Sequence, residues 1–579
     1  MPGDTGPAPA LPLPDIAWDE GGPRSARFGD GYHGAEDGLA EAAHVFIDGN
    51  DLPARFARVR SGQIFVLGEL GFGTGVNALA ALRAWADRGH TDGHLWIVSA
   101  EGYPLSRAQM RRSLAANAAR WPEIAGASRA LLAAYPDPLP GQATVRLGHD
   151  ATLTLLFGDA GATLASADVA ADAWMLDGFS PRTNPDMWTD DLMALVAARS
   201  RPGATAATFT VAGSVRRALA GAGFAWTKRP GFGRKLECLA ARLSGGAPPP
   251  PRPRVGIVGA GIAGACLAEA LMRLGAAPVV FDPAPASGAS GNPGGLLTPR
   301  LQAADDPISR FYRDAYLYAR RHYAECCPDA VRTLGGSVSM NERRVAKVLS
   351  LGIWPTGELI ASKTGFDAPG AAVLRPGLAA ARLLDGIATT RRAPALTRKD
   401  GAPCLDDEPF DAVVLAAGAA TPLLMKDARL ARTLTARRGQ IDLFAAPPPA
   451  RILSGDGYAA PLGEMTLAGA TYSDAEFGAT ADPQDADTAV NAATVTRLTG
   501  AAPGVHRGTR AALRLASRDR HPVSGRHQDG VYLLTALGSR GLMTAPLLGA
   551  DLASALLGAP RPLPLDQQAV LRPTRFQLL

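Results

Sequence analysis

Short apolar runs alternate with helix-like segments through the first half of the chain. The apolar runs occupy residues 64–70, 95–100, 152–157, 173–176 and 204–210, and residues 76–86 have the spacing of a helix. Strands that are apolar nearly throughout are typical of a parallel sheet buried on both faces. We therefore predict a doubly wound α/β domain, whose ligands bind at the carboxyl ends of the strands.

A second strand, turn and helix pattern begins at residue 255. The apolar run 255–258 leads into Gly259, Gly261 and Gly264, and a further apolar strand ends at Asp282. In a dinucleotide-binding fold, such glycines let a pyrophosphate rest on the helix N-terminus, and the acid binds the ribose. The pattern predicts a second α/β domain with its own cofactor.

A proline-rich segment, residues 244–254, lies between the two patterns. A chain of 579 residues exceeds the size of one hydrophobic core, and prolines favour an extended spacer. We predict domains at residues 1–243 and 255–579, joined by this linker. Residues 1–13 are rich in proline and glycine and lack the features of a signal peptide, so we expect a loose terminus.

Composition narrows the class of protein. The chain is 47% hydrophobic without a run of about 18 apolar residues, which predicts a cytoplasmic protein with no membrane span. Its five cysteines have no metal-ligand spacing and are odd in number, so we expect reduced thiols and no metal. A net charge of +5 permits a polyanionic partner but is weak support for one.

An acidic residue stands at or just beyond the end of four predicted strands: Glu69, Glu101, Asp159 and Asp177. Gly71, Gly73 and Gly75 follow the first of these strands and permit a tight turn with close approach of a ligand. Glu101 is placed to accept hydrogen bonds from ribose hydroxyls, and Asp159 from an adenine amine. This arrangement favours S-adenosyl-L-methionine, a cation without a pyrophosphate, over a dinucleotide.

Asp177 opens a proline-rich loop, residues 177–188, beside the expected methyl donor. A primary amine has a pKa of about 10 and is mostly an ammonium ion at neutral pH. A carboxylate that accepts the ammonium's hydrogen bonds orients the amine and helps to remove its proton, so we predict a catalytic role for Asp177. The alternative is that Asp177 only caps the loop through its own backbone.

Three further glycine-rich segments favour FAD over a nicotinamide dinucleotide in the second domain, because a tightly held flavin needs backbone from distant parts of the chain around its ring. Their candidate cofactor-binding residues are Ser290, Gly291, Asn292, Gly418, Gly538, Ser539, Arg540 and Gly541.

Arginines dominate the late stretch 509–522. Arg510, Arg514 and Arg518 share a spacing of four, so in a strand they would project on the same side. One of them facing the flavin would clamp a substrate carboxylate through two parallel hydrogen bonds. For Arg510 and Arg518, a solvated basic face or a phosphate-contacting edge is an equally good interpretation.

Several specific runs occur in order along nearly the whole chain. They are FGDGY (28–32), VFIDGNDLP (45–53), GFGTGVN (71–77), DAWMLDGFSPRTNPDMW (172–188), GASGNPGG (288–295), RRGQ (437–440), SRDRHP (517–522) and LGSRGL (537–542). Together they resemble the MnmC family of bifunctional tRNA-modifying enzymes.

The resemblance implies two reactions on the wobble uridine of tRNA. A C-terminal FAD domain similar to glycine and D-amino-acid oxidases, with an α+β substrate subdomain, would remove the carboxymethyl group of 5-carboxymethylaminomethyl-(2-thio)uridine and release glyoxylate. An N-terminal Rossmann-like class I methyltransferase domain would then methylate the exposed amine with S-adenosyl-L-methionine. Arg514 matches the oxidases' substrate arginine and is therefore the catalytic candidate in the FAD domain. We expect a monomer.

Two other classes of function remain open. One is a small-molecule amino-acid oxidase fused to an amine methyltransferase, and the other is a non-catalytic tRNA-binding scaffold with decayed cofactor sites. The acids at the strand ends and the glycines of both turns are all present, which argues against decay.

Overall fold

The computed structural model describes residues 11–19, 22–33, 37–89, 92–246, 252–425 and 427–576. The chain forms two compact units, one of Met1–Arg252 with Arg273–Gly275 and Leu557–Leu565, the other of Pro253–Met272, Ala276–Leu556 and Asp566–Leu579. Most of the predicted loose terminus, and residues 247–251 of the predicted linker, lie outside the described residues. The domain boundaries at 243 and 255 therefore stay a prediction.

The first unit is built on an eight-stranded sheet with the order β10-β11-β9-β8-β4-β5-β7-β6. Its strands are β4 (Ile64–Leu70), β5 (His94–Glu101), β6 (Gly141–Arg146), β7 (Ala151–Phe157), β8 (Ala171–Leu176), β9 (Ser200–Thr208), β10 (Phe224–Pro230) and β11 (Glu237–Leu243). The strands β7, β5, β4, β8 and β9 are parallel. Antiparallel pairs extend the sheet at both sides, β6 with β7 on one side, and β11 with both β9 and β10 on the other. The doubly wound prediction for this half is confirmed.

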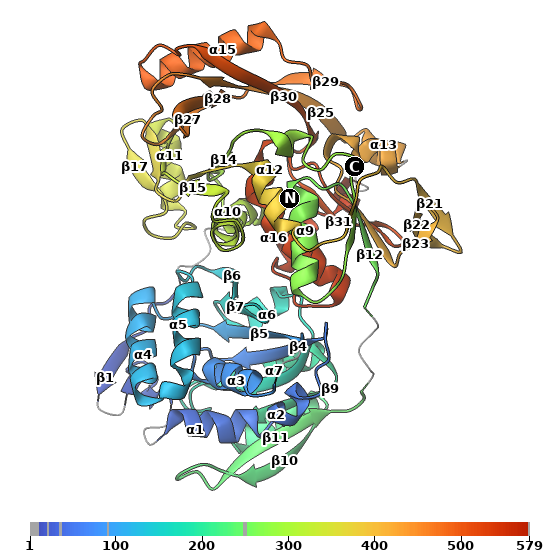
Figure 1. The fold of residues 1–579 in the computed structure, drawn as a ribbon. Coiled ribbons are helices and arrows are strands. Elements are labelled where there is room, and N and C mark those ends of the chain that lie inside the picture. Colours follow the sequence, from blue (N-terminus) through green and yellow to red (C-terminus); the bar gives the residue numbers. More distant parts are fainter. Residues whose placement is uncertain are drawn as a thin grey trace. The chain divides into compact units, whose positions relative to one another are not determined.

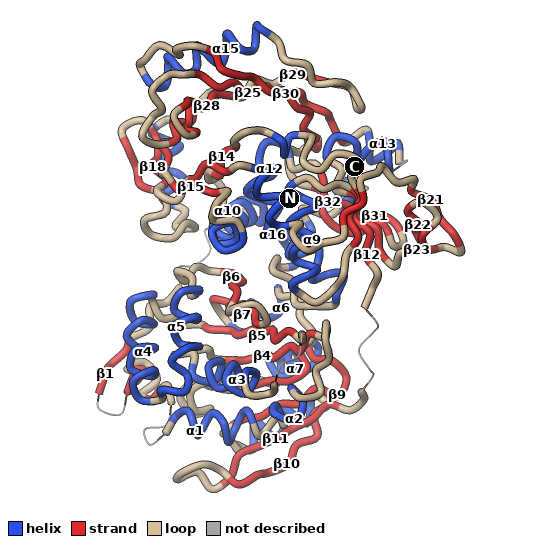
Figure 2. The backbone as a smooth tube through the Cα atoms, in the orientation of Figure 1, coloured by secondary structure: helices blue, strands red, loops and turns tan. Residues whose placement is uncertain are grey.

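Helices lie on both faces of this sheet (Figures 1 and 2). They are α1 (Gly38–Ala42), α2 (Leu52–Phe56), α3 (Val76–Ala86), α4 (Arg107–Arg120), α5 (Ala125–Ala134), α6 (Ala160–Ser166), α7 (Asp190–Ala198) and α8 (Gly213–Gly221). Leu79 of α3 and Leu131 of α5 join the buried cluster formed by sheet residues such as Leu67 and Ile97. A small antiparallel sheet precedes α1, with strands β1 (Ile16–Asp19), β2 (Gly22–Ser25) and β3 (Asp30–Gly31).

The predicted bounds of β4 and α3 are the observed ones, and the other predicted strands differ by a few residues at their ends. The largest difference is in β9, which starts at Ser200 and ends at Thr208. There the hydroxyl of Thr208 accepts a hydrogen bond from the amide of Thr210, so the chain turns before the predicted end at residue 210.

The second unit contains a six-stranded sheet with the order β20-β13-β12-β24-β32-β31. Its strands are β12 (Val255–Val258), β13 (Val279–Phe281), β20 (Thr389–Thr390), β24 (Ala412–Leu415), β31 (Val523–Gln528) and β32 (Val531–Thr535), and all but β31 are parallel. Helix α9 (Ile262–Arg273) follows β12, and α16 (Gly541–Leu557) follows β32. The predicted strand, turn and helix at residue 255 is confirmed.

A nine-stranded sheet forms the rest of this unit's framework, with the order β17-β18-β16-β26-β27-β28-β25-β29 and β30 paired to β25. Its strands are β16 (Gly336–Ser339), β17 (Ile360–Ser362), β18 (Gly365–Ala368), β25 (Leu434–Phe444), β26 (Ile452–Gly455), β27 (Gly457–Leu462), β28 (Met465–Gly469), β29 (Ser473–Ala475) and β30 (His506–Ser517). Helix α15 (Asp485–Thr499) packs on β25, β27 and β28 (Figure 1).

Two small sheets and several helices complete the second unit. The sheets are β14 (Gly295–Leu297) with β19 (Ala372–Leu374) and β15 (Val331–Thr333), and β21 (Leu396–Lys399) with β22 (Ala402–Leu405) and β23 (Glu408–Pro409). The helices are α10 (Pro307–Cys326), α11 (Glu342–Ser350), α12 (Pro376–Leu383), α13 (Thr421–Met425), α14 (Ala428–Ala431) and α17 (Leu565–Ala569).

The five cysteines, all among the described residues, form no disulfide bond, and four of them are buried. Within the described part of the chain, no helix is long and apolar enough to cross a membrane. The same residues contain no group of three or more His, Cys, Asp or Glu side chains that would hold a metal ion.

Gly68 of β4 tests the packing at the centre of the first sheet. Its missing Cβ atom would lie 2.3 Å from the Trp174 ring, so Gly68→Ala should lower the free energy of unfolding by about 1–3 kcal/mol through overpacking. Urea unfolding followed by tryptophan fluorescence measures this unit, because every tryptophan except Trp354 precedes residue 244.

Gly126→Ala in α5 is the matched control. A Cβ atom there meets nothing within 4 Å, so the change should raise stability by up to about 1 kcal/mol. Equal effects of the two substitutions would contradict the packing described for β4 and β8.

Candidate active sites

Four acidic residues lie at one edge of the first unit's sheet. Glu69 lies near the end of β4, Glu101 ends β5, and Asp159 and Asp177 follow β7 and β8. The chain leaves β4 toward β5 on one side and later returns to β8 on the other, so the strand order reverses at β4. Ligands of such sheets bind outside the carboxyl ends of the strands at this reversal, where Glu69 and Asp177 lie.

The glycine turn after β4 has the predicted tight conformation. Gly71, Gly73 and Gly75 have φ values of 84°, 51° and 78°, which other residues rarely adopt. A Cβ atom on Gly71 would lie 3.3 Å from the carbonyl oxygen of Asp177. The amide of Gly73 donates to Glu101 Oε2 at 2.7 Å, so the second strand's acid holds the turn in place.

Glu69 is only 1% exposed, and its two carboxylate oxygens differ. Oε2 accepts a 2.6 Å hydrogen bond from the hydroxyl of Ser99, whereas Oε1 has no hydrogen-bond partner. Burial raises the pKa of Glu69 to about 8, and the negative charges of Asp177 and Glu101 add to the effect. A buried acid with an unpaired oxygen beside a glycine turn fits a positively charged ligand.

Asp177 is held by two hydrogen bonds. Its Oδ1 accepts from the amide of Gly178 and its Oδ2 from the side-chain amide of Asn77, both at 2.8 Å. Burial nevertheless raises the pKa of Asp177 to about 6. The hydrogen bond from the amide of Gly178 is the backbone cap that the sequence analysis gave as the alternative role of Asp177. It is compatible with a role as a base, because each carboxylate oxygen keeps a second lone pair.

The sequence reasoning missed Asn77 as a site residue, although it lies in the second position of the helix that follows the glycine turn.

The predicted roles of Glu101 and Asp159 in binding ribose and adenine remain predictions. Glu101 Oε1 accepts a hydrogen bond from the amide of Tyr103 at 2.7 Å. Because Oε2 accepts one from the amide of Gly73, both carboxylate oxygens of Glu101 already bind main-chain amides. Asp159 is exposed and caps α6 by accepting from the amide of Ala162 at 2.8 Å.

Main chain packs directly on main chain in the turn from β12 to α9 of the second unit. A Cβ atom on Gly259 would lie 2.4 Å from the carbonyl oxygen of Ala416, and one on Gly264 would lie 1.8 Å from that of Gly259. Asp282, after β13, accepts a 2.7 Å hydrogen bond from the amide of Ala260. The acid and the glycines therefore meet at the start of α9, as a pyrophosphate and ribose site requires.

The segment with Ser290, Gly291 and Asn292 lies at the same helix start. Ser290 Oγ accepts from the amide of Ile262 at 2.9 Å and would lie 3.1 Å from a Cβ atom on Gly261. The side-chain oxygen of Asn292 is buried without a hydrogen-bond partner. This cradle and its unpaired acceptor fit a ligand that approaches the backbone closely.

The remaining candidates follow neighbouring strands of the same sheet. Gly418 comes after β24 and Gly538 after β32, with φ values of 55° and 56°. A 3-10 turn with Gly538, Ser539 and Arg540 then leads into Gly541, where α16 begins. Arg540 Nη1 donates to Thr298 Oγ1 at 3.1 Å. The structure thus brings together the strand-end candidates of the second unit, although their binding of a cofactor stays a prediction.

Arg514 lies in the middle of β30, opposite Arg437 of β25. A Cβ atom on Gly439 would lie 3.3 Å from its Cζ, so the glycine leaves room for the guanidinium group. The same Cζ lies 5.2 Å from the centre of the Tyr472 ring. Burial raises the pKa of Tyr458, and the nearby charge of Arg514 opposes this. Arg514 thus lies among two tyrosines, in surroundings that suit a carboxylate.

The other two arginines have different positions. The guanidinium group of Arg510 donates to the carbonyl oxygens of Ser287 and Gly288, so it fastens the loop before Ser290. Arg518 lies outside the strand of Arg510 and Arg514, because β30 ends at Ser517 and Arg518 is exposed in the following turn.

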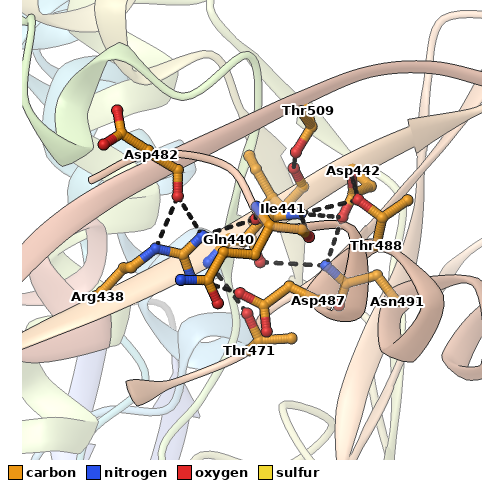
Figure 3. A network of polar contacts seen from close by, with 11 residues as sticks. Arg438, Gln440, Ile441, Asp442, Thr471, Asp482, Asp487, Thr488, Asn491 and Thr509 are labelled. Carbon is orange, nitrogen blue, oxygen red and sulfur yellow. Dashed lines mark hydrogen bonds and ion pairs between the residues drawn. The ribbon is translucent and has the colours of Figure 1, made fainter. Parts of the chain in front are cut away.

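A buried polar network holds the other face of β25 (Figure 3). Asp442 is 0% exposed and accepts from Asn491 Nδ2 at 2.7 Å and from Thr488 Oγ1 at 3.0 Å, both on α15. Although burial raises the pKa of Asp442, these hydrogen bonds lower it below its usual value. Arg438 pairs with Asp487 of the same helix. Strand β25, the partner of the strand with Arg514, is thereby fixed to α15.

Comparisons with known proteins find matches to both halves of the chain. Residues 122–244 match a family model described as S-adenosyl-L-methionine-dependent methyltransferase, and residues 254–555 match one described as FAD dependent oxidoreductase. The chain is 39% identical to the "tRNA 5-methylaminomethyl-2-thiouridine biosynthesis bifunctional protein MnmC" of Caulobacter vibrioides, over 98% of each chain. It is 35% identical to the protein of that name from Chromohalobacter salexigens, over 98% of this chain and 94% of the other.

Among solved structures, the iminodiacetate oxidase of Chelativorans sp. BNC1 is 23% identical, with a TM-score of 0.46, over 54% of this chain and 97% of that one. The two family models describe a methyltransferase followed by an FAD dependent oxidoreductase, and the MnmC relatives match 98% of the chain at 35–39% identity. The chain therefore belongs to the MnmC family of bifunctional proteins.

Proposed function

We propose that the chain performs two successive reactions on the wobble uridine of tRNA. The FAD domain, residues 255–579, converts 5-carboxymethylaminomethyl-(2-thio)uridine to the 5-aminomethyl form. The methyltransferase domain, residues 1–243, then converts this to 5-methylaminomethyl-(2-thio)uridine. The supporting observation is the match to MnmC proteins over 98% of the chain, which covers both sites. We further propose that the protein is a cytoplasmic monomer with 244–254 as its linker.

In the oxidative reaction, Arg514 binds the substrate carboxylate through two parallel hydrogen bonds. The glycine carbon loses a hydride and the attached nitrogen loses a proton, and water then hydrolyses the imine to glyoxylate and a primary amine. FAD supplies the acceptor for the two electrons when it is bound. Residues Gly259, Gly261 and Gly264 would hold its pyrophosphate on α9, and Asp282 its ribose.

In the methylation, Asp177 accepts hydrogen bonds from the substrate ammonium group and takes its proton. When bound, S-adenosyl-L-methionine would supply the methyl group to the nitrogen lone pair that this frees, with its carbon–sulfur bond broken and a neutral thioether as the leaving group. Glu69 offers its unpaired oxygen to the positive charge of that donor, and Glu101 keeps the glycine turn in the conformation that admits it. Asn77 holds Asp177 from α3 and thereby orients the base.

Mass analysis of wobble nucleosides tests this division of labour. With tRNA that carries the carboxymethylaminomethyl group, omission of S-adenosyl-L-methionine should leave the aminomethyl form.

Two variants should block different steps. Arg514→Lys keeps the charge but loses the paired hydrogen bonds, so the carboxymethylaminomethyl form should persist, and the KM for tRNA in the oxidative step should rise by about 10- to 100-fold. Asp177→Asn should accumulate the aminomethyl form instead. Activity on free amino acids that is insensitive to tRNA and salt would contradict the proposal.

The pH dependence of methylation reports on Asp177. Because its pKa is raised to about 6, it is ionised and can take the ammonium proton only above that pH. We expect kcat/KM for aminomethyl-tRNA to be level from about pH 6 upward and to fall about tenfold per unit below it. Asp177→Asn must use the neutral amine from solution, so its lower rate should rise about tenfold per unit up to about pH 10. Parallel profiles for the two proteins would contradict the role of a base.

Binding of S-adenosyl-L-methionine should release a proton from Glu69. With its pKa raised to about 8, Glu69 is protonated at pH 7 in the free protein, and a cationic ligand favours the ionised form. Affinity should therefore increase as the pH rises toward 8 and level off above it. Calorimetry at pH 7 in buffers of different ionisation enthalpy should show about one proton released, and Glu69→Gln should abolish the release. Equal proton release by the variant would refute this assignment.

A further inference from the structure

Four aromatic side chains from three loops gather at the carboxyl edge of the first unit's sheet. Phe28 lies in the turn between β2 and β3, Tyr32 follows β3, Tyr103 follows β5, and Phe179 follows β8. The Phe28 and Phe179 rings are stacked, with centroids 4.7 Å apart and an interplanar angle of 24°. Tyr103 contacts Phe28 edge-on at 5.4 Å, and Tyr32 contacts Phe179 edge-on at 5.3 Å.

These rings are not ordinary core residues. All four are partly exposed, whereas core aromatic residues of the same unit, such as Trp96, Tyr135 and Phe157, are almost wholly buried. Aromatic groups left partly in water on loops beside a catalytic residue are typical of a ligand surface. Their separation along the sequence means that the fold, and not local chain geometry, brings them together.

The two tyrosines lie beside the glycine turn and Glu101. A Cβ atom on Gly73 of the glycine turn would lie 3.0 Å from the Tyr32 ring. Burial raises the pKa of Tyr32, and the charge of Glu101 adds to this. The amide of Tyr103 donates to the same Glu101 carboxylate at 2.7 Å. Both tyrosines are thus tied to the residues proposed to hold S-adenosyl-L-methionine.

The two phenylalanines belong to the loop that follows Asp177 and to the turn stacked on it. Phe179 is two residues after Asp177, the proposed base. The amide of Ser180 donates to Asp30 at 3.4 Å, which fastens the turn with Phe28 to the loop with Phe179. Arg27, exposed in that turn, places its Cζ 4.9 Å from the Tyr103 ring centre, and no described acidic residue pairs with it. Flat apolar rings beside an unpaired cation are what a single-stranded nucleotide recognises.

From this geometry we infer that Phe28 and Phe179 form a stacking platform for the uracil ring of the wobble nucleotide during methylation. The inference rests on the proposed function. The base leaves the anticodon stack, lies on the platform, and thereby presents its 5-aminomethyl group to Asp177. Stacking tolerates different bases, so the platform supplies affinity and orientation, while Asp177 selects the amine.

Methylation kinetics and donor binding, measured on the full chain, separate this role from the alternatives. Phe179→Leu and Phe28→Leu keep apolar volume but remove the ring, whereas Phe179→Tyr and Phe28→Tyr are matched controls that keep it. With aminomethyl-tRNA, each Leu variant should raise the KM for tRNA about tenfold, and the Tyr variants should stay within about threefold of wild type. The Kd for S-adenosyl-L-methionine, measured by calorimetry, should be unchanged in all four, which also shows that the site is folded.

Two results would overturn the inference. Weakened donor binding in the Leu variants would mean that the rings cover the donor or support its pocket, and an unchanged KM for tRNA would mean that they do not touch the base. Failure of the proposed function is distinguishable, because wild-type protein would then transfer no methyl group to aminomethyl-tRNA.

Discussion

In the turn from β12 to α9, a Cβ atom on Gly264 would lie 1.8 Å from the carbonyl oxygen of Gly259, so only glycine lets the helix start there. The turn from β4 to α3 needs glycine for a different reason, because Gly71, Gly73 and Gly75 all have positive φ. Side-chain acids then hold both turns, Asp282 through the amide of Ala260 and Glu101 through that of Gly73. Both turns therefore require residues without a side chain.

Local patterns predict what local forces decide. The bounds of strand β4 and helix α3 follow from the sequence to the residue, because an apolar run and a helical period meet at glycines that fix the boundary. The nine-stranded sheet leaves no such local pattern, since it pairs strands far apart in the chain, such as β16 with β26. In the site, the strand-end acids can be found from sequence. The hydrogen bond from Asn77 to Asp177 and the stacking of Phe28 on Phe179 cannot be found from sequence, because each joins residues that are distant along the chain.

The methyltransferase site concentrates acids that oppose one another's ionisation. Burial raises the pKa of both Glu69 and Asp177, and the charge of Asp177 raises that of Glu69 further. Such a cluster lowers the stability of the empty site, which a cationic donor and an ammonium substrate would relieve. In the second unit the charge at the candidate site has the opposite sign, because Arg514 is a cation with the rings of Tyr472 and Tyr458 nearby.

The polar network on β25 has a consequence for the strand's alignment. Arg438, Gln440 and Asp442 alternate with Arg437, Gly439 and Ile441. A slip of one residue would turn a buried carboxylate onto the face of the sheet that carries Arg514, and an isoleucine toward the amide and hydroxyl groups of α15. Such a shift would cost the whole set of hydrogen bonds at once. The hydrogen bonds from α15 therefore fix the alignment of β25 with β30, and with it the place of Arg514 opposite Arg437.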